Sequence, residues 1–261
     1  MHTTQQKFEE TAIIIKQEEI ADDIYSMWLH TEQIAAHAKA GQFVSVYCKE
    51  GSRLLPRPIS ICEIDKENKT LRLVYRKAGA GTAEFSGYGA GETLRLIGPL
   101  GNGFPLDKGY KKVFLIGGGI GVPPMVELSK QLPGEKIVVS GYRGGDLFLK
   151  DELSRHAELV VATEDGSAGT KGNVLDAIKE NGLTADAIFA CGPGPMLRAL
   201  KAYAEEQGID CYLSLEERMA CGIGACLACV CKSKDVDAHT NVKNKRICKD
   251  GPVFAADEIE L

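Results

Sequence analysis

Four cysteines near the end of the chain constrain what it can fold into more than any other feature. Cys221, Cys226 and Cys229 follow the spacing C-x4-C-x2-C, and Cys248 comes later. This spacing is typical of plant-type [2Fe–2S] clusters, in which thiolates, as soft ligands, hold iron bridged by sulfide. The two glycines between the first two cysteines give the backbone the freedom that a tight loop around such a cluster requires.

Two other uses of these cysteines have to be weighed. A structural zinc site favours paired C-x2-C knuckles, whereas this chain has one such pair with an x4 step before it. Disulfides would suit a secreted protein, and nothing marks the chain as secreted. We therefore favour an iron–sulfur cluster with Cys221, Cys226, Cys229 and Cys248 as ligands. Cys231 lies two residues after Cys229, so the identity of the third ligand stays open between them.

The composition is that of an ordinary globular protein. The 261 residues suffice for two domains and a small appendage, and 44% of them are hydrophobic. The net charge of −5 argues against nucleic acid as a partner, because a phosphate backbone requires a basic face. No run of about 18 apolar residues predicts a membrane span, and residues 1–20 contain no apolar signal segment. Nine cysteines in such a chain fit a reducing cytoplasm.

The first part of the chain is rich in β-branched or alternating runs, separated by glycine, proline and charged turns. This pattern predicts a small antiparallel barrel, and we assign residues 1–109 to it. Helical periodicity is weak there except around residues 82–88. The expected strands cover residues 13–15, 24–29, 42–47, 71–75 and 93–97.

Within this region the run Arg57-Pro58-Ile59-Ser60 has a restricted backbone. Pro58 fixes its own φ and biases Arg57 toward an extended conformation, so the arginine and the serine are held on a rigid strand edge. A guanidinium suits phosphate, and a serine hydroxyl can donate to a ring nitrogen. By itself the motif is equally compatible with a surface arginine beside a strand proline.

Two further motifs follow in the same domain. Val74-Tyr75-Arg76 ends an expected strand, and Gly81-Thr82 stands where a short helical stretch opens. A glycine-rich turn that leads into a helix binds anionic phosphate through free backbone N–H groups. Residues 98–104 form a turn-rich end to the region, and residues 105–110 are the expected linker.

From residue 111 onward, apolar strands and helices alternate, which predicts a parallel sheet with ligands at the carboxyl ends of its strands. We assign residues 110–212 to this domain. The expected strands are residues 112–116, 136–140, 158–162 and 187–190, with helices ending at residue 132 and over residues 173–180 and 196–207. Glycines directly after the first strand let the backbone approach a pyrophosphate, although their spacing is not G-x-G-x-x-G.

The order of these motifs resembles the ferredoxin–NADP reductase-like flavoprotein superfamily. In that family R-P-x-S, a Tyr-Arg strand end and G-T contact FAD, G-G-G-x-G-x-x-P admits a pyridine nucleotide, and the cysteine of C-G-P-x-x-M lies near the nicotinamide. The resemblance implies an FAD site at Arg57, Pro58, Ile59, Ser60, Val74, Tyr75, Arg76, Gly81 and Thr82. It implies an NAD site at Gly117, Gly118, Gly119, Gly121, Pro123, Cys191, Gly192 and Pro193, with residues 163–172 as a second nucleotide loop.

Two of these assignments have alternatives. Cys191 could be a small buried hydrophobic residue, a common role of free cysteine, but in this setting we favour the functional role near the nicotinamide. Arg143 follows the second strand of the sheet and could meet the 2′-phosphate of NADP, or could be a solvated turn residue or a partner in a salt bridge. We favour NAD on the grounds of the family resemblance.

Residues 213–261 are too few for a core of their own, so we expect a metal cluster to organise them, and residues 232–246 to form an exposed loop. They contain E-x-R-M-A-C-G-x-G-A-C-x-x-C and C-x-D-G-P-V-F. With these motifs, the whole chain resembles the electron-transfer subunits of type B, NAD-dependent dihydroorotate dehydrogenases. That family implies an FMN-bearing catalytic partner, a heterotetramer with two copies of each chain, and electron flow from FMN through the cluster and FAD to NAD+ in pyrimidine biosynthesis.

Two rival functions remain at this point. A ferredoxin:NADP+ oxidoreductase or sulfide dehydrogenase subunit of the same superfamily shares all three modules. A non-catalytic, metal-stabilised binding protein with vestigial nucleotide folds is a candidate from another class, because a fold does not determine function.

Overall fold

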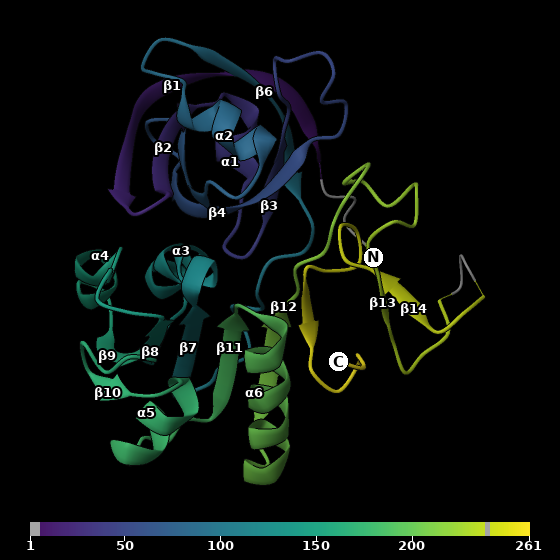
Figure 1. Ribbon diagram of the computed structural model, residues 1–261. Helices are drawn as coiled ribbons and strands as arrows, with labels where there is room; N and C mark the ends of the chain where they lie inside the picture. Colours follow the sequence, from purple (N-terminus) through teal and green to yellow (C-terminus); the bar gives the residue numbers. More distant parts are fainter. Residues whose placement is uncertain (1–5, 238–240) are drawn as a thin grey trace.

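A computed structural model describes residues 6–237 and 241–261 of the chain. Figure 1 shows a barrel above a sheet flanked by helices, with the last part of the chain beside both. None of the helices in the described ranges has both the length and the apolar character that a membrane crossing requires.

The first body is a closed antiparallel barrel with the strand order β1-β2-β5-β4-β3-β6, which confirms the predicted fold class. Its first strand alternates as a barrel wall requires, because Ala12 and Ile14 are buried while Ile13 and Ile15 are exposed. The elements are β1 (Phe8–Ala21), β2 (Ile24–His30), α1 (Gln33–His37), β3 (Phe43–Val46), β4 (Arg57–Asp65), β5 (Thr70–Arg76), α2 (Ala80–Ser86) and β6 (Thr93–Leu100).

One barrel strand, β4, is absent from the list of expected strands, although its first residues, Arg57 to Ser60, were expected on a strand edge. It begins at Arg57 and Pro58, and β3 pairs with it so that Ser45 lies opposite Pro58. Proline has no N–H to give to a ladder, so it weakens the sequence signal for a strand and is tolerated at a strand's first residues. The short helix α1 also escaped prediction, because five residues are too few to show a helical period.

The second body is a seven-stranded sheet with the order β10-β9-β8-β7-β11-β12-β15. All pairs are parallel except β12 with β15, and β11 is buried along its whole length, as a strand covered on both faces should be. The elements are β7 (Lys112–Gly118), η1 (Gly119–Gly121), α3 (Pro123–Gln131), β8 (Glu135–Tyr142), α4 (Lys150–Ser154), β9 (Glu158–Thr163), β10 (Thr170–Lys171), α5 (Val174–Glu180), β11 (Ala187–Cys191), α6 (Gly194–Gln207), β12 (Asp210–Ser214) and β15 (Val253–Ala255).

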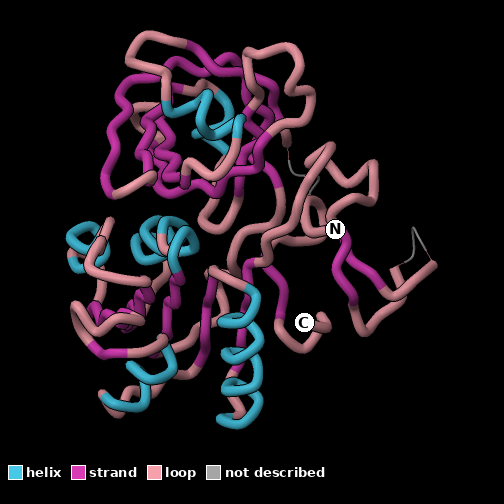
Figure 2. The backbone as a smooth tube through the Cα atoms, in the orientation of Figure 1, coloured by secondary structure: helices cyan, strands magenta, loops and turns pink. Residues whose placement is uncertain are grey.

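The C-terminal segment is mostly loop (Figure 2), yet it is attached to both bodies. Strand β15 adds to the edge of the sheet, and the segment shares one apolar cluster with Phe43 and Leu100 of the barrel. The expectation of an exposed loop over residues 232–246 is wrong at its ends. Strands β13 (Val230–Lys232) and β14 (Asn244–Arg246) pair as a hairpin, and Arg246 is buried. Residues 238–240 of that expected loop lie outside the described residues.

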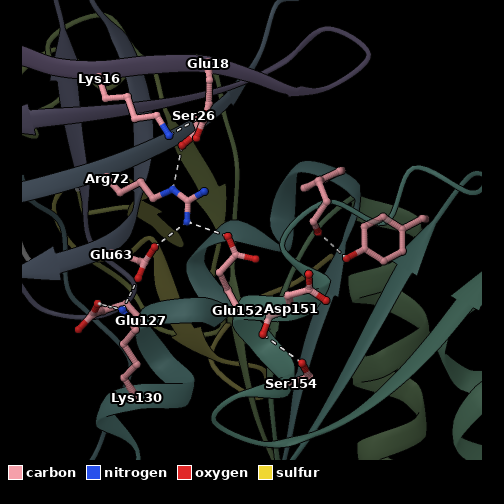
Figure 3. A network of polar contacts seen from close by, with 12 residues as sticks. Lys16, Glu18, Ser26, Glu63, Arg72, Glu127, Lys130, Asp151, Glu152 and Ser154 are labelled. Atoms are coloured by element: carbon pink, nitrogen blue, oxygen red, sulfur yellow. Dashed lines mark hydrogen bonds and ion pairs between the residues drawn. The ribbon is translucent and has the colours of Figure 1, made fainter. Parts of the chain in front are cut away.

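A buried arginine joins the barrel to the sheet domain (Figure 3). Arg72 on β5 is 6% exposed, and its Nη1 lies 2.7 Å from Glu63 Oε2 on β4 and 3.2 Å from Glu152 Oε1 on α4. Lys130 on α3 pairs with Glu63 from the other side. Burial opposes ionisation of Glu63, but hydrogen bonds from Lys130 and Arg72 outweigh it and hold the pKa of this carboxyl below its usual value. Charges from both domains thus balance one another at the joint.

We predict that Arg72→Met destabilises the protein by about 2–4 kcal/mol, because it leaves buried carboxylates with fewer partners. The free energy of unfolding, measured with urea, checks this. Lys16→Met is the matched control, since Lys16 and its partner Glu18 are 59% and 42% exposed and such pairs contribute little. Equal effects of the two substitutions would contradict the proposed importance of the joint.

Candidate functional site

The loop that carries the first three cysteines folds around a sulfur. Sγ of Cys221 accepts hydrogen bonds from Ile223 N, at 3.5 Å, and from Ala225 N, at 3.3 Å. Burial opposes ionisation of this thiol, but these bonds, together with those from Cys226, lower the pKa of Cys221 to about 7. Thiolate is the form that binds metal, so the loop prepares Cys221 as a ligand.

Cys229 and Cys248 form a second contact, and both are almost fully buried. Cys248 N lies 3.4 Å from Cys229 Sγ. The hydrogen bond from the Cys248 thiol lowers the pKa of Cys229 to about 6, and the same bond raises the pKa of Cys248. Cys229 is therefore the thiol of this pair that ionises more readily, and a metal binds the ionised form.

The four thiols consequently meet as two pairs, Cys221 with Cys226 and Cys229 with Cys248. Each iron of a [2Fe–2S] cluster takes two thiolates, so two pairs match its two irons. One zinc ion would need its ligands around a single point. The donor set fits the expected cluster better than zinc.

Cys231 has a different environment from Cys229. It lies on β13, where its thiol donates to the Lys245 carbonyl oxygen at 3.6 Å, and burial raises the pKa of Cys231. This geometry supports Cys229 as the third ligand, which we retain as a proposal.

Arg246, which was expected in an exposed loop, holds two parts of this site together. The guanidinium of Arg246 is 3.0 Å from Asp250 Oδ2, and its Nη1 donates to the Gly224 carbonyl oxygen at 3.5 Å. Arg246 therefore ties the loop of the first three cysteines to the turn that follows Cys248. The only sequence signal was an arginine two residues before that cysteine and an aspartate two residues after it.

We predict that Cys229→Ser loses or impairs the cluster, whereas Cys231→Ser keeps it. The reason is that the Cys229 thiol contacts Cys248, another proposed ligand, whereas the Cys231 thiol bonds to the Lys245 carbonyl oxygen. Iron and acid-labile sulfide content, together with the visible spectrum, provide the measurement. Bleaching by Cys231→Ser with an intact spectrum in Cys229→Ser would show that the third ligand is misassigned.

The structure brings the expected FAD motifs together at one end of the barrel. Arg57 begins β4, and its side chain lies over Gly81 of α2, where a Cβ would come within 2.0 Å of Arg57 Nε. A side chain at this position would displace the guanidinium from where it lies. Thr82 Oγ1 accepts hydrogen bonds from Ala78 N and Gly79 N, at 2.9 and 3.1 Å, and so fixes the turn before α2.

The stretch at the end of β5 carries Tyr75, the aromatic residue for which the resemblance implies a flavin contact. Tyr75 is 3% exposed inside the barrel, where its hydroxyl donates to Gln17 Oε1 at 2.9 Å and its ring meets the edge of Phe85. Val74 is buried as well, whereas Arg76 is exposed. Arg76 is the exposed side chain of this stretch, and the flavin contact of Tyr75 stays a prediction.

The expected nucleotide motifs meet at the carboxyl edge of the sheet. Gly117 and Cys191 are register partners at the ends of β7 and β11. A Cβ on Gly121 would lie 2.2 Å from the Cys191 carbonyl oxygen, so the glycine turn packs directly on the second motif. Pro123 then starts α3, whose first turn faces this edge. Such an edge, with a helix N-terminus beside it, is where parallel sheets bind nucleotides.

Cys191 and Arg143, whose roles had alternatives in the sequence, both lie near this edge. Cys191 is 1% exposed, and burial raises the pKa of its thiol to about 12. Arg143 is exposed on the loop after β8.

Comparisons with known proteins place the chain in a family. A relative from Geobacillus sp. (strain WCH70), named dihydroorotate dehydrogenase B (NAD(+)), electron transfer subunit, is 42% identical over 97% of this chain and 99% of its own length. The chain belongs to this family of electron transfer subunits. A relative of the same name from Listeria monocytogenes serotype 4b (strain F2365) is 46% identical over 95% of this chain and 97% of its own. Residues 216–260 also match the family model of the iron–sulfur cluster binding domain of dihydroorotate dehydrogenase B.

A solved structure is similar to the chain over nearly its whole length. It is that of an NADH-dependent reduced ferredoxin–NADP oxidoreductase, described for flavin-based electron bifurcation. The TM-score is 0.86 with 29% identity, and the match covers 95% of this chain and 89% of that one. The predicted family and fold class are thereby confirmed, with a member of the rival enzyme class as a structural neighbour of this electron transfer subunit.

Proposed function

We propose that the chain carries electrons from a partner subunit that oxidises dihydroorotate through a [2Fe–2S] cluster and FAD to NAD+, in pyrimidine biosynthesis. One observation supports this route above all. Gly222 of the cysteine loop packs against Ser45 on β3, and the neighbouring strand β4 carries Arg57 to Ser60. The cysteine loop thus contacts β3, and β3 pairs directly with the strand that carries the flavin motif. Electron transfer between a cluster and a flavin requires that the two lie close together.

A different set of residues would hold each of the three groups. Cys221, Cys226, Cys229 and Cys248 would hold the cluster, Arg57 and the turn at Gly81 the flavin, and the glycine turn after β7 the nicotinamide nucleotide. When bound, FAD exchanges hydride with nicotinamide and single electrons with a cluster, so it links the two. The chain's own part is to bind and orient these groups, and we assign it no catalytic acid or base.

The FMN-bearing catalytic partner would approach the cysteine loop. Ile223 and Leu227 are 45% and 43% exposed beside the proposed ligands, and Val230 is 37% exposed. Exposed apolar side chains gathered on one loop are typical of a protein interface. We further propose a heterotetramer with two copies of each chain, located in the cytoplasm, where the nine free cysteines would remain reduced.

The decisive experiment mixes the purified chain with the FMN subunit, dihydroorotate and NAD+. We expect NADH to form, and we expect Cys226→Ser to abolish its formation while NADH-driven reduction of a two-electron dye persists, because the dye needs only flavin and nucleotide. The Cys231→Ser variant is the matched control and should behave as the wild type. No turnover with dihydroorotate would contradict the proposal, and protein that binds no flavin would favour a non-catalytic binding role.

A second candidate function, ferredoxin:NADP+ oxidoreductase, is favoured by the solved structure described above. The same preparation distinguishes it, because reduced ferredoxin would then drive NADP+ reduction without the FMN subunit. The higher identity and full coverage of the dihydroorotate dehydrogenase relatives favour the first candidate.

The assembly can be tested independently of turnover. We predict that native mass spectrometry of the reconstituted complex shows two copies of each chain, because two apolar loops would each cover one catalytic subunit. A complex with one copy of each chain would contradict the stoichiometry while leaving the electron route intact.

A further inference from the structure

Ser45 on β3 has a buried hydroxyl that the fold itself does not use. The residue is 1% exposed, and its Oγ has no hydrogen-bond partner among the residues that the structure describes. A buried hydroxyl without a partner costs about 1–3 kcal/mol, so native proteins rarely keep one without a function for it.

The position of Ser45 indicates what that function is. Side chains alternate along β3, so Val44 and Val46 enter the barrel core while Phe43 and Ser45 face the opposite side. Phe43 there packs into the same apolar cluster as Cys229 and Cys248. Ser45 therefore faces the cysteine-bearing segment.

The hydroxyl lies directly on the cysteine loop. A Cβ built on Gly222 would be 2.7 Å from Ser45 Oγ and 3.4 Å from Leu100 Cδ1. Gly222 has a φ of +68° and follows Cys221, whose sulfur already accepts two backbone hydrogen bonds. Glycine at this position keeps the space between the hydroxyl and the loop free of a side chain.

We propose that Ser45 donates a hydrogen bond to a sulfur at the Cys221 end of the cluster and thereby raises its reduction potential. Reduction adds negative charge to the cluster, and a donor aimed at its sulfurs stabilises the reduced form. Ser45 makes reduction of the cluster more favourable and binds neither flavin nor nucleotide. It is therefore a positioning residue in the electron route. This inference rests on the proposed cluster.

The test is a potentiometric titration of the purified chain, with the cluster followed by electron paramagnetic resonance and the flavin by visible absorbance. Ser45→Ala should shift the equilibrium constant for cluster reduction roughly threefold to tenfold against reduction, as expected for the loss of one hydrogen bond. A tenfold change corresponds to about 59 mV for one electron. The flavin potential should stay unchanged, and Ser45→Thr, which keeps the hydroxyl, should restore the wild-type value.

Two further variants keep the outcome interpretable. Ser129→Ala removes another buried hydroxyl, which donates to the Val126 carbonyl oxygen within α3, and should leave both potentials unchanged. Ser45→Cys keeps a weaker donor of similar size and should shift the cluster in the same direction as Ser45→Ala, which covers the case that Ser45→Ala fails to fold.

Unchanged cluster potentials in both Ser45→Ala and Ser45→Cys would overturn the proposal, and so would a shift confined to the flavin. Iron and sulfide content of the wild-type chain tests the proposed cluster separately. A wild type without iron would refute the function proposed above, whereas a loaded wild type with insensitive potentials would refute only the role of Ser45.

Discussion

The shared apolar cluster beneath the cysteines is the contact on which the rest of the arrangement depends. The last fifty or so residues cannot bury enough apolar surface alone, so they insert Ile247 and Phe254 between the barrel and the sheet. Strand β15 then continues the sheet beyond β12. Because Cys229 and Cys248 lie in the same cluster, the proposed ligand geometry is fixed by packing against both domains. The cysteine site is thus a product of all three parts of the chain.

The second constraint is the charged joint at Arg72. It connects β4 and β5, which carry the proposed flavin motifs, to α4 and, through Glu63 and Lys130, to α3. Helix α3 begins at the glycine turn proposed for the nicotinamide nucleotide. A buried network with several geometric requirements holds two surfaces in one orientation more specifically than apolar contact does. The relative placement of the flavin and nucleotide motifs is therefore determined by residues outside either motif.

Much of this organisation could be predicted because local rules and tertiary packing agree. The alternation around Ile14 and the apolar strand before Gly117 identified the barrel and the sheet correctly. The failures have physical causes. Pro58 weakened the strand signal of β4, so only its first residues were expected on a strand edge. The charged residues of β13 and β14 gave no period to recognise. Arg246 appeared solvated, because its acidic partners become neighbours only after the hairpin folds.

By itself the sequence determined the family, the order of the modules and the cysteines available to a cluster, because these depend on residue type and spacing along the chain. Only the tertiary structure decided how the cysteines pair, that Cys231 bonds to its own hairpin, and that Ser45 lies against Gly222. These contacts join segments far apart in sequence, and their geometry follows from strand register and core packing. The spacing of the cysteines predicted a cluster, and the folded chain adds that the Ser45 hydroxyl lies against the loop that carries the first three of them.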